Sequence, residues 1–302
     1  MTSSTLRDQE LLPALPLDSW KGTLATVHMW TQIVGKVRLK LTPLVNHWWN
    51  VPFYLTARGL TTSAMPYVGG TVEVQFDFID HKLLIETSNG RDFVMPLASE
   101  SVADFYKEFM SALAELGVGI SIWTMPCEIA DPIAFDRDVV HAEYDRDAVS
   151  RFWRILAWVD QQLKEFRAGF LGKASPVHFF WGSFDLAVTR FSGRIAPPRP
   201  GADSITQEAY SHEVSSAGFW AGGGDIAGPC FYSYAAPEPP GFSTQKVEPA
   251  TAYYHPQLKE FLLMYDDVRS AESPKSTLMA FLNSTYDAAA DLGKWDRKAL
   301  ER

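Results

Sequence analysis

The 302-residue sequence predicts an α+β protein with two tandem, similar halves, each a mainly antiparallel sheet with long helices packed on one face. The first observation behind this class is the order of elements, because a helix, three or four short strands and another helix occur twice. The second is a pair of nine-residue segments with similar aromatic patterns, one in each half. We expect a lead-in at 1–17, an N-terminal half at 18–126 and a C-terminal half at 127–302, together forming one compact unit.

The N-terminal half opens with a helix over residues 20–41, where apolar residues recur every three or four positions until Pro43. Alternating apolar and polar residues, with turns at MPYVGG and SNGRD, then predict strands in VPFYLTARGL, TVEVQFDFI, KLLIET and FVMPL. An amphipathic helix follows, with Ser101 as its N-cap and Gly117 at its end. The segment VGISIWTMP reads as one more strand.

The C-terminal half repeats this order after an acidic, irregular segment at 126–147. A long helix is predicted over about 147–170. A closing helix is predicted over about 274–292, where Ser273 followed by proline makes a cap and first-turn pair. Between these helices, the strand candidates are 177–192 and the segments AYSHEVSSAGFW, CFYSYA and EFLLMY.

A short sequence similarity between the two halves favours an internal duplication. The segment HWWNVPFYL at 47–55 can be aligned with HFFWGSFDL at 178–186 so that the histidines and the aromatic pairs coincide. In this alignment Tyr54 stands where Asp185 does, so Asp185 is expected to be a specialised residue rather than shared scaffold. Two similar halves also predict a crevice between them as the place for a ligand.

The composition excludes several classes of protein. The net charge is −9 and no Lys/Arg-rich run occurs, which excludes binding to nucleic acid or to an anionic membrane surface. The two cysteines, Cys127 and Cys230, form no metal-type cluster, and no apolar signal core or membrane-length segment is found, so we expect a cytoplasmic protein. The aromatic content of 13% predicts thick aromatic packing or a cavity lined by rings.

The stretch VHFFWGSFDLAVTRFSGR at 177–194 is the first candidate site. In one straight strand, His178 lies on an apolar face and Asp185 lies on the opposite, more polar face with Trp181. Only a bulge at Gly182 would bring His178 and Asp185 together as an acid–base pair. The structural alternative is that Asp185 caps a helix or pairs with an arginine.

The adjacent His212 and Glu213 are the second candidate, although neighbours on a strand diverge. No HExxH motif, P-loop, dinucleotide fingerprint or GxSxG elbow is present. No residue is therefore assigned as a metal ligand, and no cofactor is implied. An iron site built from His178, His212 and a carboxylate stays open as an alternative.

A third set of residues predicts the ligand chemistry. A polar row on the first helix and several arginines supply donors that suit a carboxylate or phosphate. The expected ligand-binding residues are His28, Gln32, Lys36, His47, Arg58, Trp181, Arg190 and Arg194.

Six long segments of the chain are distinctive: HMWTQIVGKVRLKLTPLVNHWWNVPFYLTARGLTT, FDFIDHKLLI, SVADFYKEF, SPVHFFWGSFDLAVTRFSGR, EAYSHEVSSAGFW and STYDAAADLGKWDR. Through them the chain resembles, over about residues 14–302, an uncharacterised bacterial domain-of-unknown-function family. Ala221 and Ala236 depart from the GFWPGG and SYAYPEP patterns common in that family, which concerns local loop shape only. The resemblance implies an α+β protein and transfers no catalytic residue.

These observations favour a small-molecule enzyme with an aromatic-lined crevice between two halves that accepts an anionic substrate. His178 or His212 would be the general acid or base, Asp185 or Glu213 would orient or deprotonate, and the arginines would hold the anion. The alternatives are a non-catalytic small-molecule binding protein, a metal-dependent oxygenase-type enzyme using two histidines and a carboxylate, and a partner-binding subunit.

Overall fold

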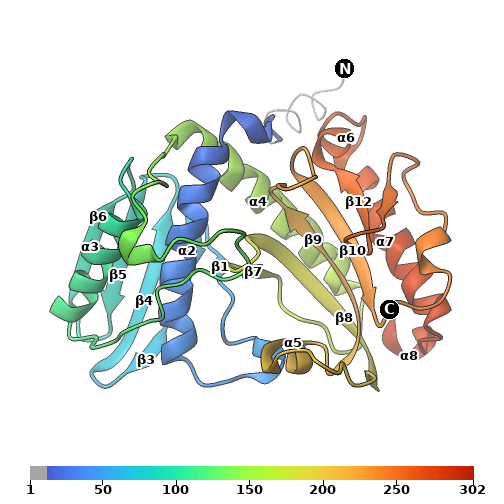
Figure 1. Ribbon diagram of the computed structural model, residues 1–302. Helices are drawn as coiled ribbons and strands as arrows, with labels where there is room; N and C mark the ends of the chain where they lie inside the picture. The colour runs from blue at the N-terminus through green and yellow to red at the C-terminus, as the bar shows by residue number, and fades with distance from the viewer. Residues whose placement is uncertain (1–11) are drawn as a thin grey trace.

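The computed structural model describes residues 12–302, so the predicted lead-in at 1–17 lies mostly outside the described residues. Two six-stranded sheets with flanking helices form the molecule (Figure 1). The strand order is β1-β2-β4-β5-β6, with β3 paired to β4, in the first sheet and β11-β12-β10-β9-β8-β7 in the second. Every strand pair in both sheets is antiparallel, which confirms the predicted α+β class with two similar halves.

The first half follows the predicted order of elements closely. Its helices are η1 (Leu17–Ser19), α2 (Lys21–Leu41), η2 (Asn46–Trp48) and α3 (Val102–Glu115), and η3 (Phe135–Arg137), from the beginning of the second half, packs against α3. Its strands are β1 (Tyr54–Leu55), β2 (Gly59–Thr61), β3 (Met65–Tyr67), β4 (Gly70–Asp77), β5 (Lys82–Thr87) and β6 (Asp92–Pro96). Ser101 caps α3 by accepting a hydrogen bond from the Asp104 backbone N–H, as predicted.

The second half is built in the same way around a longer helix pair. Its helices are α4 (Arg146–Ala168), α5 (Ser204–Ala209), η4 (Phe242–Thr244), α6 (Tyr265–Arg269), α7 (Pro274–Leu292) and α8 (Arg297–Leu300). Its strands are β7 (His178–Phe180), β8 (Asp185–Ile195), β9 (His212–Trp220), β10 (Cys230–Ala236), β11 (Tyr253–His255) and β12 (Glu260–Met264). None of the described helices combines the length and apolar composition needed to cross a membrane.

Three local predictions are wrong. The segment VGISIWTMP forms no strand, MPYVGG contains β3, and 177–192 is a hairpin rather than one strand. The hairpin pairs His178 with Ala187 and Phe180 with Asp185, and its turn includes Phe184 with a left-handed φ of 58°. Directly paired residues share a sheet face, so His178 and Asp185 lie on the same face of the second sheet.

The predicted structural equivalence of residues 47–55 and 178–186 is also wrong, although the two segments are in contact. His47 and Trp48 belong to a 3-10 turn, whereas His178 and Phe179, with which they were aligned, belong to a strand. Phe53 and Phe179 nevertheless exchange two backbone hydrogen bonds of 2.9 Å in an isolated antiparallel bridge. The two halves are therefore joined where the first strand of each sheet begins.

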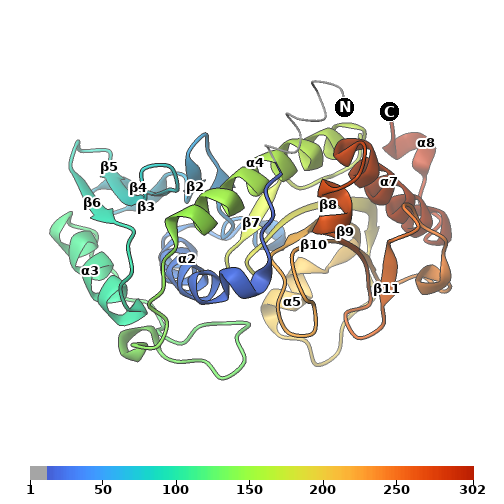
Figure 2. The same cartoon turned by 90° about the horizontal axis from the view of Figure 1, so that it is seen from above.

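The two faces of the second sheet have different partners. Helices α4 and α7 pack on one face, where Leu186, Val188 and Phe231 belong to the main hydrophobic core. Figure 2 shows these helices on one side of the sheet and α5 on the other. The face beneath α5 is the one that carries the candidate site.

Candidate functional site

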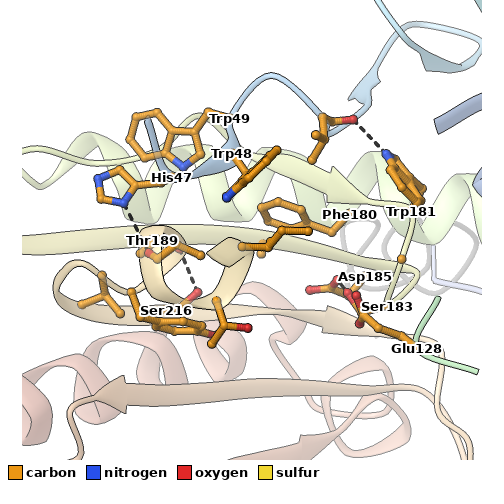
Figure 3. A pocket seen from close by; sticks show the side chains of 18 of the residues that line it. His47, Trp48, Trp49, Glu128, Phe180, Trp181, Ser183, Asp185, Thr189 and Ser216 are labelled. Atoms are coloured by element: carbon orange, nitrogen blue, oxygen red, sulfur yellow. Dashed lines mark hydrogen bonds between the residues drawn. The ribbon is translucent and has the colours of Figure 1, made fainter. Parts of the chain in front are cut away.

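A cavity of about 400 Å³ lies on this second face of the sheet, beneath α5 and the 47–51 segment. Strands β7 to β10 form its floor, and segments from the first half contribute to its roof. Figure 3 shows Trp48 and Phe180 over its middle, Asp185 and Glu128 toward one end and Thr189 and Ser216 toward the other. Its lining consists of Leu39, His47, Trp48, Trp49, Val51, Cys127, Glu128, Phe180, Trp181, Gly182, Ser183, Asp185, Ala187, Thr189, Phe191, Ile205, Thr206, Ala209, Tyr210, Val214, Ser216, Tyr232 and Tyr234.

The sheet register explains why this face is hollow. Ala187, Gly218 and Tyr232 lie opposite one another on three neighbouring strands, so two of the three residues in this row are small. A Cβ atom at Gly218 would overlap the Tyr232 ring and the Leu186 carbonyl oxygen. Gly218 therefore lets the tyrosine ring lie across the sheet, and Ala187 leaves space above it.

Asp185 is the charged group at the depth of the cavity. Only 7% of the residue is exposed, and its carboxylate accepts hydrogen bonds from the hydroxyl groups of Ser183 and Tyr232. Burial raises the pKa of Asp185 above its ordinary value, whereas these two hydrogen bonds lower it. Buried carboxyl groups of this kind are often used in catalysis or to bind a ligand.

Hydroxyl groups occupy the next row of the floor. The Thr189 and Ser216 hydroxyl oxygens lie 2.9 Å apart, and so do those of Tyr210 and Tyr234. Each is a hydrogen-bond distance. These four hydroxyl groups and that of Tyr232 form a hydroxyl strip on an otherwise aromatic surface.

His47 connects the roof segments. Its Nδ1 lies 3.1 Å from the Glu208 carbonyl oxygen in α5, and its Nε2 lies 2.6 Å from the Lys173 ammonium nitrogen. Nδ1 therefore donates and Nε2 accepts, which is the neutral imidazole. Burial and the Lys173 charge both lower the pKa of His47. His47 and Trp48 have φ values of 60° and 59°, a strained backbone that is typical of functional loops.

Trp181 forms one wall of the cavity and is held firmly. Its indole Nε1–H donates to the Val51 carbonyl oxygen over 2.9 Å. Its ring covers Gly35 of α2 so closely that a Cβ atom at that position would overlap it. This wall is therefore fixed by the first half of the chain.

Glu128 stands at the rim. The residue is exposed, has a left-handed φ of 57°, and its Oε1 lies 2.6 Å from the position that a Cβ atom at Gly182 would occupy. No lysine or arginine is found among the described residues that line the cavity. The charged lining groups therefore include two carboxylates and no guanidinium or ammonium group.

The arginines expected to hold an anion lie elsewhere. Arg190 is on the opposite face of the sheet, donates to the Phe166 carbonyl oxygen and stacks 3.5 Å above the Phe166 ring. Arg194 pairs with Glu213 at 2.6 Å. Arg58 pairs with Asp77 and Asp80 on the first sheet, at 2.6 and 2.8 Å. The structure thus corrects the predicted convergence of these three side chains.

The predicted catalytic histidines do not meet a carboxylate. His178 is 1% exposed, is packed edge-on by Trp49, Tyr54 and Phe180, and has no hydrogen-bond partner at either ring nitrogen. Burial lowers the pKa of His178 to about 3, so the ring is neutral at ordinary pH. His178 lies outside the cavity lining and is not positioned as its general base.

His212 and Glu213 also lie outside the lining. The His212 ring is 5.5 Å from the His47 ring, and Glu213 is held by Arg194 and by the Ser192 hydroxyl. Within residues 12–302, no three His, Cys, Asp or Glu side chains converge on one position suited to a metal ion. The geometry therefore does not assemble the two-histidine, one-carboxylate iron site.

The polar row on α2 binds backbone rather than ligand. His28 Nε2 lies 2.8 Å from the Gly182 carbonyl oxygen, and the Gln32 amide exchanges two 2.8 Å hydrogen bonds with the Cys127 backbone. Lys36 donates to the Met125 carbonyl oxygen over 2.7 Å. The row fixes the 125–128 segment and the hairpin turn, which places Glu128 at the rim.

Sequence reasoning identified Asp185, Trp181 and His47 but missed other residues of the lining. The missed residues include Trp48, Trp49, Glu128, Tyr210, Ser216, Tyr232 and Tyr234. The alternation of Tyr232 and Tyr234 in CFYSYA was the available signal, since alternate strand residues share a face.

The comparisons with known proteins place the chain in a family without assigning an activity. A model of a family of unknown function, DUF5996, matches residues 12–302, so the chain belongs to that family. No curated protein and no solved structure gave a significant match.

Proposed function

We propose that this protein binds a small organic molecule in the cavity beneath α5. The observation that carries the proposal is a cavity of about 400 Å³ with a buried carboxylate and a hydroxyl strip inside aromatic walls. Natural small-molecule sites have this size and this mixture of apolar walls with few polar groups. Segments from both halves enclose it, which supports a ligand site at their junction.

A cavity-filling substitution tests this proposal. Ala187→Leu adds apolar volume at the floor, where the small side chain of Ala187 leaves space. Ala114→Leu makes the same change on the exposed side of α3 and is the matched control. A library of small metabolites is screened against all three proteins by thermal shift, and hits are confirmed by native mass spectrometry.

We expect one or more compounds to bind the wild type and Ala114→Leu with 1:1 stoichiometry and to fail with Ala187→Leu. A ligand present at about 100 times its Kd adds about 2.7 kcal/mol of stability, which is readily measured. Hits that bind Ala187→Leu as well as the wild type, or a library without a single hit, would contradict the proposal.

Acid–base catalysis is the second candidate function, and the position of Asp185 favours it. Its carboxyl group is buried, contacts the cavity and is oriented by Ser183 and Tyr232. Such a group can exchange a proton with a bound molecule. Catalysis predicts that Asp185→Asn retains binding of a neutral ligand but abolishes its conversion, as followed by mass spectrometry. Conversion that survives the substitution would contradict this role of Asp185, and a ligand that the wild type binds without converting would indicate a binding protein.

The anionic ligand expected from the arginines stays a competing prediction. The library contains carboxylates and phosphates, so the same screen tests it.

A further inference from the structure

The charge of Asp185 is not compensated by any side chain of the described residues. Ser183 and Tyr232, its two side-chain partners, are neutral hydroxyl residues. No ion pair of Asp185 occurs within residues 12–302, although other carboxylates of the chain, such as the buried Asp77 and the partly exposed Asp287, are paired with arginines. Lys173, which lies near the roof, is engaged with His47.

An ionised carboxylate removed from water and left without an opposite charge is unfavourable. Two hydroxyl donors offset only part of this effect. A positive charge placed in the cavity would face Asp185 directly, because Asp185 lines it.

The walls of the cavity are also suited to a positive charge. Trp48, Trp49 and Trp181 all line the cavity, and the faces of indole rings attract cations. The side chain of Glu128 adds negative charge at the rim. The lining contains no lysine or arginine within the described chain that would repel a cation or attract an anion.

An organic cation fits this site better than a metal ion. No group of three metal-ligating side chains occurs in the described part of the chain, and the volume far exceeds that of a single ion. Aromatic side chains favour a flat apolar ring. The hydroxyl groups of Thr189 and Ser216 can contact polar substituents at the other end of the cavity.

Resting on the proposed small-molecule site, we propose that its ligand is an aromatic amine whose protonated nitrogen pairs with Asp185 while its ring lies among the tryptophans. The positive charge of the ligand then supplies the partner that Asp185 lacks, and the indole faces contribute to the same preference.

Three probes with one ring system and different charges test this inference. Tryptamine carries an ammonium group, tryptophol a hydroxyl group and indole-3-acetate a carboxylate. Their affinities are measured by isothermal titration calorimetry at pH 7.5 with the wild type, Asp185→Asn and Glu272→Gln. Glu272 is an exposed carboxylate between α6 and α7, so its substitution changes the net charge equally and is the matched control.

We expect the wild type and Glu272→Gln to bind tryptamine more tightly than tryptophol, and to bind indole-3-acetate most weakly. Asp185→Asn should weaken tryptamine binding by about 30-fold or more, as for the loss of one partner of a buried charge pair, and should leave tryptophol binding within about twofold. Circular dichroism and thermal melting establish that the variant is folded.

The other outcomes separate the ligand class from the proposed function. Equal binding of all three probes, or a preference for indole-3-acetate, overturns the amine but leaves the cavity as a binding site. Failure of all three to bind at millimolar concentration also overturns the amine, and the Ala187→Leu screen then decides the proposed function. An amine preference that persists in Asp185→Asn overturns the role of Asp185.

Discussion

Glu260 offers a quantitative test of the electrostatics of this sheet. It begins β12 and is partly buried, and burial followed by the charge of Asp185 raises its pKa from 4.5 to about 7. At about 1.4 kcal/mol for each pH unit, this difference corresponds to about 3 kcal/mol of lost stability above pH 7. Partial exposure reduces the value, so we expect Glu260→Gln to stabilise the protein by about 1–2 kcal/mol at pH 8.

The sign of the pH dependence follows from the two states of the chain. In the unfolded chain the Glu260 carboxyl ionises near pH 4.5, whereas the folded protein retains the proton up to about pH 7. Folding therefore binds a proton between these values, and the stability of the wild type falls as the pH rises through this window. Glutamine does not titrate, so the gain should be present at pH 8 and absent at pH 4.

Urea denaturation at pH 4, 6 and 8, followed by tryptophan fluorescence, measures this difference. Glu272→Gln removes an exposed carboxylate and should change the free energy of unfolding by less than about 0.5 kcal/mol at each pH. A gain for Glu260→Gln that is equal at pH 4 and pH 8, or a loss at pH 8, would refute the reasoning.

Two further predictions concern the walls and roof of the cavity. Gly35→Ala places a methyl group against the Trp181 ring and should lower the free energy of unfolding by about 1–3 kcal/mol in urea denaturation, whereas Gly119→Ala, which meets no atom within 4 Å, should not. The neutral ring of His47 accepts from Lys173 and donates to α5, and its pKa is lowered, so this contribution to stability is present above about pH 6.5 and is lost as the pH falls. Amide exchange in α5, corrected for its intrinsic rate, should therefore be faster at pH 5 than at pH 7.5, and Lys173→Met should reduce the difference. Exchange that is independent of pH would contradict this role for His47.

The four long helices could be predicted well because their signals are local, whereas the short helices α5, α6 and α8 were not predicted. The last long helix has the predicted bounds Pro274–Leu292, and the first differs by one residue at its start. Caps such as Ser101 act within a few residues of the chain, so the sequence contains the whole interaction.

The hairpin at 178–195 could not be read in the same way. Its turn lacks an Asn-Gly or Asp-Gly pair, and Phe184 adopts a left-handed backbone that bulky residues rarely take. The prediction of one straight strand placed His178 and Asp185 on opposite faces, whereas the hairpin places them on the same face. Within β8 itself the alternation holds, and it already places Arg190 opposite Asp185, which argues against a shared ligand.

The cavity exists because the second face of each sheet has a different environment. In the first sheet, one face is buried and the other exposes charged residues such as Glu86. In the second sheet the corresponding face is covered, partly by segments of the first half. Trp48 from the first half lines the cavity, and the Trp181 ring packs against Gly35 of the first half. Part of the roof comes from the first half and the whole floor comes from the second, so the complete cavity can form only when both are folded together. Binding at Asp185 should therefore stabilise the junction of the halves, and not the second sheet alone.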